Sequence, residues 1–345
     1  MKTIRIGIIG LGANCRLRHV PGLQECENVE ITGIVNRSTK STAAVANEFG
    51  IPKTYDHWEQ LVADPELDAV VIGTWPYLHC PITLAALGSG KHVLTEARMA
   101  RNVEEARQML AASQQRPELV AQIVPSPLGF DALFTIRRMV DEGYLGELRE
   151  VVAIATDDAF ANPDTPLHWR QSAELSGQNV LALGILHEAV SRWIPKTESV
   201  LAQAQTFTQK RPDPASGELV AVERPDRVHV LTQIDGGALG LYHLSSATHF
   251  AAGIQVQFFG SEGTIKYLIS SENKLLAGKA GSPSLAEVKI PPEEAYAWRV
   301  ERDFIEAIRG EKKVELTDFA TGVRYMQFTE AVVQSAELGR RVDVG

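Results

Sequence analysis

The chain has 345 residues, of which 44% are hydrophobic and 22% are charged, and its formal net charge is −9. This composition is typical of a soluble globular protein, and the length suits two domains. No basic run offsets the acidic balance, which excludes nucleic acid and an anionic membrane surface as main partners. No apolar run reaches the roughly 18 residues of a membrane span. Three scattered cysteines favour a reducing, cytoplasmic location over a disulfide framework.

A glycine turn lies between two β-rich runs at the start of the chain, 4–9 and 29–35. Gly10 permits a tight turn, and Gly12 lets the backbone approach a pyrophosphate. The next helix offers free N–H groups to the phosphates, and Cys15 replaces the usual third glycine. This layout predicts a dinucleotide site. Its candidate cofactor-binding residues are Gly10, Gly12, Ala13, Asn14, Asn36, Arg37 and Ser38.

The end of the second β-rich run indicates which dinucleotide binds. An NAD site usually has Asp or Glu there, whereas this chain has Asn36-Arg37-Ser38. An acid would repel a 2′-phosphate, and all three of these side chains would bind one. We therefore expect NADP(H) to be preferred and NAD(H) to be possible. The alternative is that Arg37 stacks on the adenine of either cofactor.

Strands and helices alternate up to residue 124, which predicts a doubly wound parallel sheet, a Rossmann domain, over 1–124. Helices are expected over 41–49, 58–63, 81–89 and 103–114, and strands over 68–73, 91–95 and 119–124.

The pattern changes after Pro125, which predicts a second, α+β domain over 125–345. Its helices are expected over 131–142, 177–193, 294–309 and 319–338, and its strands over 148–156, 200–208, 227–234, 238–245, 254–259, 264–269 and 287–290. Hairpin signals between these strands predict a large, mostly antiparallel open sheet. One face of such a sheet needs cover, so we expect a homodimer or homotetramer.

Several motifs together resemble the glucose-fructose oxidoreductase and inositol dehydrogenase (Gfo/Idh/MocA) family over nearly the whole chain. They are Gly10-Leu-Gly12, 68–74 with His79-Cys-Pro81, 86–96, Gly143-Tyr-Leu-Gly-Glu147, and His168-Trp-Arg170 leading to Gly184 and Arg192-Trp193. The resemblance implies an NAD(P)-dependent oxidoreductase that acts on a sugar, a cyclitol or a derivative. It also implies that Thr74, Trp75, His79 and Glu96 belong to the cofactor site, with Glu96 near the nicotinamide ribose.

The chain departs from the family at its catalytic positions. Members usually carry Glu-Lys-Pro, and here the sequence is Glu96-Ala97-Arg98. Members also carry an Asp, a His and an Asp on one helix, and these positions align with Ala182, Leu186 and Ala189. The usual acid/base set is therefore missing.

The nearest replacement for the missing acid/base is His187, which would face the substrate only if its helix carried a bulge. The alternative is a histidine buried at the domain interface. Arg98 would stabilise negative charge on the substrate oxygen. Candidate substrate-binding residues are Trp75, Asp157, Asp158, Trp169, Arg170 and Glu188.

Each of these residues also has a purely structural alternative. Trp75 would be a buried loop aromatic, Asp157 and Asp158 would cap a loop, and Arg170 would form a structural ion pair. His243 and His249 lack metal-ligand spacing, so no metal is expected. Two functions remain: hydride transfer at a secondary hydroxyl or ketone of a sugar-like substrate, or a catalytically degenerate sensor of NAD(P) or sugar with the same fold.

Overall fold

The computed structural model describes residues 2–270 and 272–345 and divides into two compact units. Unit 1 comprises residues 1–125 and 299–326, and unit 2 comprises residues 126–298 and 327–345. The chain therefore returns to unit 1 near its end, whereas the sequence suggested a continuous second domain over 125–345. Within the described residues, no helix has both the length and the apolar character that a bilayer crossing requires.

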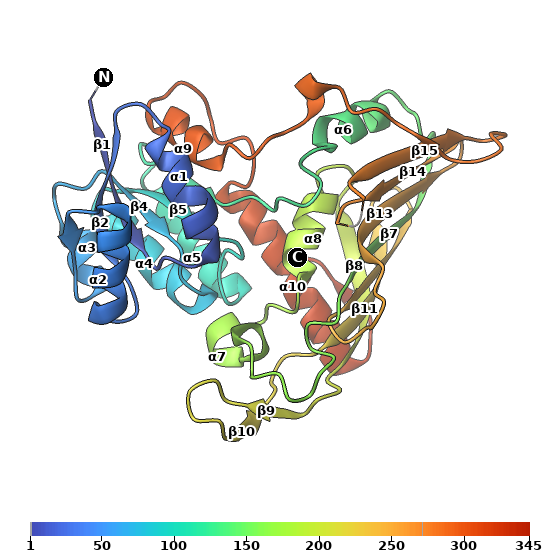
Figure 1. The fold of residues 1–345 in the computed structure, drawn as a ribbon. Coiled ribbons are helices and arrows are strands. Elements are labelled where there is room, and N and C mark those ends of the chain that lie inside the picture. The colour runs from blue at the N-terminus through green and yellow to red at the C-terminus, as the bar shows by residue number, and fades with distance from the viewer. Residues whose placement is uncertain (1, 271) are drawn as a thin grey trace. The chain divides into compact units, whose positions relative to one another are not determined.

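Unit 1 is built on a six-stranded parallel sheet with the order β3-β2-β1-β4-β5-β6 (Figure 1). The strands are β1 (Ile4–Ile9), β2 (Val29–Val35), β3 (Lys53–Thr54), β4 (Ala69–Ile72), β5 (His92–Thr95) and β6 (Ala121–Ile123). β4 is buried along its whole length, as its apolar run predicts for an inner parallel strand. The strand order runs outward in opposite directions from β1 and β4. The carboxyl ends of these two strands are thus the place where an open α/β sheet binds its ligand.

Helices of unit 1 come from both ends of the chain. They are the π-helical turn Cys15–His19, α1 (Val20–Gln24), α2 (Thr39–Phe49), α3 (Trp58–Ala63), α4 (Pro76–Gly88), α5 (Val103–Gln114), α9 (Val300–Ile308) and the first part of α10 (Phe319–Leu338). Phe319 and Met326 belong to the same apolar core as Val70 and Ile72. The C-terminal segment is therefore part of the unit 1 core.

Unit 2 contains a nine-stranded sheet with the order β16-β15-β14-β13-β7-β12-β11-β8-β17. The strands are β7 (Leu148–Thr156), β8 (Thr197–Gln205), β11 (Arg227–Ile234), β12 (Leu239–Ser245), β13 (Gly253–Gly260), β14 (Gly263–Leu268), β15 (Lys274–Lys279), β16 (Ala286–Glu287) and β17 (Val342–Asp343). Only β7 and β12 pair in parallel within this sheet. The expected open and mostly antiparallel sheet is confirmed.

The remaining elements of unit 2 are short. They are α6 (Leu133–Asp141), the 3-10 turns Trp169–Gln171 and Pro292–Glu294, α7 (Ala173–Ser176), α8 (Leu183–Val190), and the two-stranded sheet β9 (Lys210–Pro212) and β10 (Leu219–Ala221). The helix expected over 177–193 is shorter in the structure, where α8 begins only at Leu183 and ends at Val190. Gly177 instead ends the preceding α7, with a positive φ of 66°.

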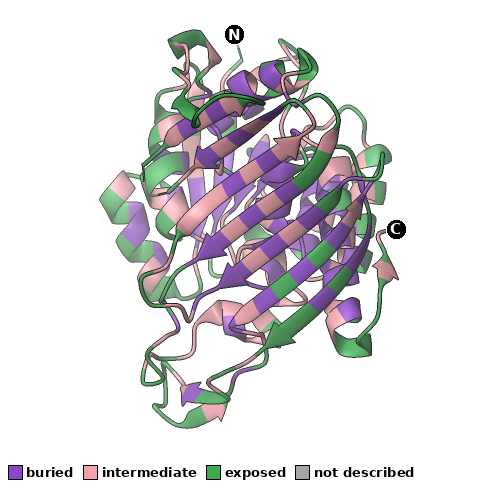
Figure 2. Ribbon diagram, turned by 90° about the vertical axis from the view of Figure 1, so that its right-hand side faces the viewer, coloured by how far each residue is buried: buried purple, intermediate pink, exposed green. Residues whose placement is uncertain are grey.

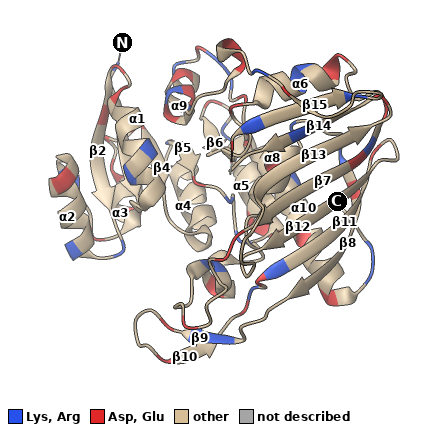
Figure 3. Cartoon of the chain, turned by 45° about the vertical axis from the view of Figure 1, so that its right-hand side comes forward, with Lys and Arg blue, Asp and Glu red and all other residues tan. Residues whose placement is uncertain are grey.

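The two faces of the nine-stranded sheet differ in exposure, and Figure 2 shows the resulting alternation along the strands. α8 and the end of α10 pack on one face, where the Ser335 hydroxyl accepts a hydrogen bond from the Ala202 N–H at 2.9 Å. On the other face, Leu201 of β8 and Leu231 of β11 are cross-strand neighbours, and they are 42% and 56% exposed. Charged residues are sparse along the middle of these strands (Figure 3).

Candidate functional site

The glycine turn after β1 fits a dinucleotide. Gly10 has a φ of +80°, and a Cβ there would lie 2.9 Å from Thr74 Cγ2, so only glycine suits this position. A Cβ on Gly12 would meet nothing nearer than the Gly73 oxygen at 3.7 Å. The missing side chain at Gly12 thus leaves open space for a ligand, as a pyrophosphate requires.

Cys15 occupies the position of the usual third glycine without filling that space. Its side chain is 1% exposed and packs against Gly73, where an added Cβ would lie 2.2 Å from the Cys15 sulfur. The loss of one glycine from the motif is therefore matched by a glycine at the end of β4. Burial raises the pKa of the Cys15 thiol, so this cysteine stays protonated and unreactive.

A cavity of about 560 Å³ opens at the carboxyl ends of β1, β2 and β4. Six of the residues predicted for the cofactor line it, namely Gly10, Gly12, Asn36, Arg37, Thr74 and Trp75. The structure therefore brings together residues that are far apart in the sequence at the place where this fold binds its ligand.

The side chains after β2 present donors to this cavity. Asn36 Oδ1 accepts a hydrogen bond from the Leu11 N–H at 3.3 Å, which leaves the Asn36 amide N–H groups for a ligand. Arg37 is exposed, and its guanidinium lies 5.8 Å from the centre of the Trp75 ring. The Ser38 hydroxyl accepts a hydrogen bond from the Ser41 N–H at 3.3 Å and so caps α2. One exposed acid, Asp56, also lines the cavity.

Glu96 and His79, two other residues predicted for the cofactor site, form hydrogen bonds between segments that follow the strands of unit 1. Glu96 follows β5, and its Oε1 accepts a hydrogen bond from Asn14 Nδ2 at 2.5 Å. His79 is fully buried between two backbone carbonyls, with Nδ1 2.8 Å from the Arg98 oxygen and Nε2 3.0 Å from the Thr74 oxygen. His79 thus holds the segments after β4 and β5 together rather than facing the cavity, and burial lowers its pKa.

His187, the acid/base candidate from the sequence, lies in the interior of unit 2. α8 is a regular α-helix without a bulge, and His187 on it is 7% exposed. Its Nδ1 lies 2.9 Å from the Tyr242 hydroxyl, and burial lowers its pKa to about 3. A histidine in this setting is neutral and shut off from solvent, which argues against the catalytic role that the sequence suggested.

Glu188 also has a structural environment. It is 3% exposed, its Oε1 accepts a hydrogen bond from Arg192 Nη2 at 2.6 Å, and its Oε2 accepts one from the Ser126 N–H at 2.7 Å. Both carboxylate oxygens are therefore engaged inside unit 2, which corrects the expected contact with substrate. Glu188 and Arg192 are four positions apart and form an ion pair across one helical turn.

The other substrate candidates lie at or after the end of β7. Asp157 and Asp158 are exposed, and Asp157 Oδ1 accepts a hydrogen bond from the Ala159 N–H at 3.0 Å. The Arg170 guanidinium lies 4.8 Å from the centre of the Trp169 ring. Burial lowers the pKa of Arg170, and the charge of Asp157 opposes this effect. No carboxylate in the described ranges lies within ion-pair distance of Arg170.

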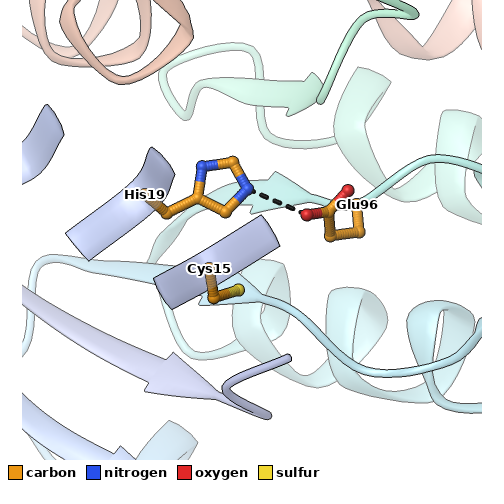
Figure 4. A group of neighbouring side chains, drawn as sticks. All are labelled: Cys15, His19 and Glu96. Carbon is orange, nitrogen blue, oxygen red and sulfur yellow. Dashed lines mark hydrogen bonds and ion pairs between the residues drawn. The ribbon is translucent and has the colours of Figure 1, made fainter. Parts of the chain in front are cut away.

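Sequence reasoning missed two functional candidates, His19 and Glu301. Cys15, His19 and Glu96 gather beside the glycine turn (Figure 4), and Glu301 reaches His19 from α9. His19 and Glu301 are 282 positions apart, and no motif in the sequence links them. The helical spacing of His19 from the glycine turn was the one available signal, since a polar residue there faces the core.

Comparisons with known proteins agree with this geometry. Residues 4–122 match the model of an oxidoreductase family with an NAD-binding Rossmann fold, and residues 134–266 match the GFO/IDH/MocA C-terminal domain. The chain is 26% identical to 1,5-anhydro-D-fructose reductase of Ensifer adhaerens, covering 99% of this chain and 98% of the relative. It is 24% identical to scyllo-inositol 2-dehydrogenase (NADP(+)) IolW of Bacillus subtilis (strain 168), covering 100% and 89%.

Solved structures show the same fold. Levoglucosan dehydrogenase in its apo form superposes with a TM-score of 0.89 at 22% identity, covering 100% of this chain and 99% of that one. Its complex with NADH and L-sorbose gives a TM-score of 0.87 at 22% identity, covering 99% of both chains. A relative of the same name from Pseudarthrobacter phenanthrenivorans is 23% identical, and the match covers 90% of this chain and 88% of that relative. With its glycine turn, its open sheet and both matching domains, this chain belongs to the GFO/IDH/MocA family of NAD-binding oxidoreductases.

Proposed function

We propose that this oxidoreductase transfers a hydride between NADP(H) and a secondary hydroxyl or ketone of a sugar-like or cyclitol substrate. The cavity at the carboxyl ends of β1, β2 and β4 carries the proposal, because donors and not a carboxylate follow β2. The Asn36 amide and the Arg37 guanidinium would bind a 2′-phosphate, and NAD(H) remains a weaker alternative. Relatives named for sugars and cyclitols support the substrate class.

The cofactor supplies the hydride, and the chain has to bind it, orient it and handle the hydroxyl proton. Gly12 leaves space for the pyrophosphate, and Trp75 is a wall of the cavity beside Thr74. Ala97 and Leu186 have no group that moves a proton, and His187 is buried as a neutral imidazole. We propose that the proton passes through Asp157, Asp158 or a water held by Arg98. Arg98 would also stabilise negative charge on the substrate oxygen.

We further propose that Arg170 binds an acidic group of the substrate. A desolvated guanidinium is costly unless an anion pairs with it, and Arg170 has no ion-pair partner among the described residues. The Trp169 ring lies against this guanidinium and would form part of the same substrate contact. Carboxylate-bearing or phosphorylated sugars are therefore the substrates to test first.

The decisive experiment is a turnover screen. NADPH and NADH are each offered with a panel of keto sugars, inososes and sugar acids, and the reverse direction is offered with NADP⁺ and the alcohols. Turnover of at least one sugar-like compound with NADPH supports the proposal. If both cofactors bind but no panel member reacts, the chain is instead a sensor of the same fold, with Ala182, Leu186 and Ala189 as the structural cause.

A further inference from the structure

His19 lies fully buried between two carboxylates in unit 1. Its Nδ1 is 2.5 Å from Glu301 Oε1 and its Nε2 is 3.0 Å from Glu96 Oε1. The side chains of His19 and Glu301 are 0% and 2% exposed, whereas that of Glu96 is 15% exposed. The string Glu301–His19–Glu96 therefore runs from the interior of the unit to the edge where β5 ends, and Figure 4 shows its outer half.

The hydrogen bonds of this string favour the charged forms of His19 and Glu96. Burial alone would lower the pKa of His19, but the hydrogen bonds to Glu301 and Glu96 outweigh it and raise the pKa to about 9. Burial would raise the pKa of Glu96, yet His19 and Asn14 hold it below its usual range. The other titratable neighbours stay neutral, because burial raises the pKa of the Cys15 thiol and lowers that of His79. At neutral pH His19 is therefore an imidazolium, and Glu96 beside it is a carboxylate.

A glycine makes room for the distant end of the string. Gly22 lies three residues after His19 on the same helical face, in α1. A Cβ on Gly22 would lie 2.6 Å from Glu301 Oε2 and 2.9 Å from Glu301 Cδ. Glycine is unfavourable within a helix relative to alanine. Here it opens the slot through which Glu301 of α9 reaches the imidazole.

The near end of the string is the partly exposed carboxylate of Glu96, which follows β5. Glu96 Oε1 accepts hydrogen bonds from both Asn14 Nδ2, at 2.5 Å, and His19 Nε2, at 3.0 Å. Glu96 Oε2 accepts none from the described residues and is not among their buried polar atoms without a partner. Two donors on one oxygen thus fix the carboxylate plane and leave Oε2 for a ligand hydroxyl.

The same side chains do not suit a metal ion. Cys15, His19 and Glu96 each place a ligand atom within 4.8 Å of the others. A metal needs a thiolate and an imidazole lone pair, but burial keeps the Cys15 thiol protonated and both His19 nitrogens lie against carboxylates. The arrangement is therefore a set of linked ion pairs between His19 and the two glutamates, and not a metal centre.

We propose that His19 is a positioning residue. Glu301 holds the His19 ring in place, and His19 in turn orients Glu96 toward the ribose hydroxyls on the nicotinamide side of the cofactor. The inference rests on the proposed cofactor site. It means that α9, which arrives near the C-terminus, controls the geometry of the cofactor site. Gly22 and Glu301 then act on cofactor binding although neither lines the cavity.

The test compares Glu301→Gln with wild type in NADPH titrations from pH 6 to 9.5. In wild type the affinity holds until His19 loses its proton near pH 9. Glu301→Gln keeps the shape and removes one of the two carboxylates, so the decline should begin at least one pH unit lower. At pH 8.5 the Kd should exceed that of wild type at least about threefold, with the two equal within about twofold at pH 6.

Two further variants separate positioning from a general loss of structure. Gly22→Ala removes no charge but displaces Glu301, and it should shift the pH profile in the same direction. Glu48→Gln makes the same change at an exposed carboxylate, which pairs with Arg16, and should leave the profile unchanged. A Glu301→Gln profile that coincides with wild type overturns the inference.

An NMR titration of the free protein covers the case in which no cofactor binds. The His19 signal, identified by its loss in His19→Asn, should titrate near pH 9 in wild type and lower in Glu301→Gln. If wild type binds neither NADPH nor NADH while His19 titrates near 9, the proposed function and its dependent positioning role both fail. If the cofactor binds and His19 titrates below 7, the positioning role alone fails.

Discussion

The imidazole of His187 stacks on the ring of Phe328, with centroids 3.5 Å apart and planes 7° apart. Tyr242 closes the same cluster through its hydroxyl, 2.9 Å from His187 Nδ1. These contacts come from α8, α10 and β12, so His187 belongs to the layer between the helices and the sheet of unit 2. Its contribution should therefore appear in stability rather than in proton transfer.

Replacing His187 with Phe keeps a ring in the stack and removes the titrating group. Burial lowers the pKa of His187 to about 3 in the folded chain, so below pH 6.5 only the unfolded chain gains a proton there. Wild type should lose about 1.4 kcal/mol of unfolding free energy per pH unit on this account as the pH falls from about 6.5 toward 3. Urea denaturation between pH 5 and 8 measures the slope, which should be smaller in His187→Phe.

Tyr242→Phe is the matched control for that experiment. It removes the hydrogen bond, at a cost of about 1 kcal/mol, but keeps the imidazole, so its pH slope should stay close to that of wild type. Turnover of His187→Phe on a proven substrate should not fall by the roughly 10²-fold typical of a lost acid/base. A loss of that size would return His187 to the catalytic site.

Cofactor choice should follow the residues after β2. Fluorescence titration should show that NADPH binds more tightly than NADH, because the Asn36 amide and Arg37 both favour a 2′-phosphate. Asn36→Asp should weaken NADPH by roughly tenfold, since it places a carboxylate beside that phosphate. Arg37→Ala should weaken NADPH more than NADH, whereas Lys40→Ala removes an exposed cation of α2 outside the cavity and should change neither. Tighter binding of NADH to wild type contradicts the assignment.

Assembly should depend on the exposed face of the nine-stranded sheet. Leu201 and Leu231 pair across this face, and we expect a second copy to cover it in a dimer or tetramer. Leu231→Glu would bury an unpaired charge in that interface and should release monomers, as measured by light scattering at micromolar concentration. Leu219→Glu is the control, because Leu219 is 66% exposed on the separate sheet of β9 and β10. A monomeric wild type refutes the expectation.

Arg170 should discriminate between acidic and neutral substrates. Arg170→Gln removes the charge and the fork of donors, so kcat/KM for a sugar acid should fall at least about tenfold through KM. Activity on a neutral polyol should change less than about twofold, since no anion is bound there. Arg170→Lys keeps the charge and should give an intermediate loss. Equal losses on both substrate types indicate a structural role for Arg170.

The fold was largely predictable from the sequence because its signals are local. β7 and β11 have the expected bounds, since alternating or apolar runs between turn residues specify a strand directly. α5 and α10 likewise begin and end where predicted. β15 was missed, because its Lys-Leu-Leu-Ala-Gly-Lys sequence is short, contains a glycine and lacks β-branched residues.

In the candidate site, too, the residues of a local motif were predictable and those placed by tertiary packing were not. Gly10, Gly12 and Asn36 follow from a motif with fixed spacing, so the sequence places them together. His187 and Glu188 were misjudged because one step along a helix changes the face by about 100°, and only packing shows which face is buried. His19 and Glu301 meet through tertiary contacts over 282 positions, and no local pattern encodes such a meeting.

The return of residues 299–326 to unit 1 affects how the protein is made. A nascent chain emerging from the ribosome presents the first 125 residues long before α9 and the start of α10 exist, and these contribute Glu301 and Phe319 to the interior of unit 1. Translation must pass through every strand of the nine-stranded sheet except β17 before the core of the first unit is complete. A chain that is truncated anywhere before α9 therefore lacks Glu301, the partner of His19 beside the glycine turn. Such a chain has an incomplete unit 1, which makes it a target for cellular quality control.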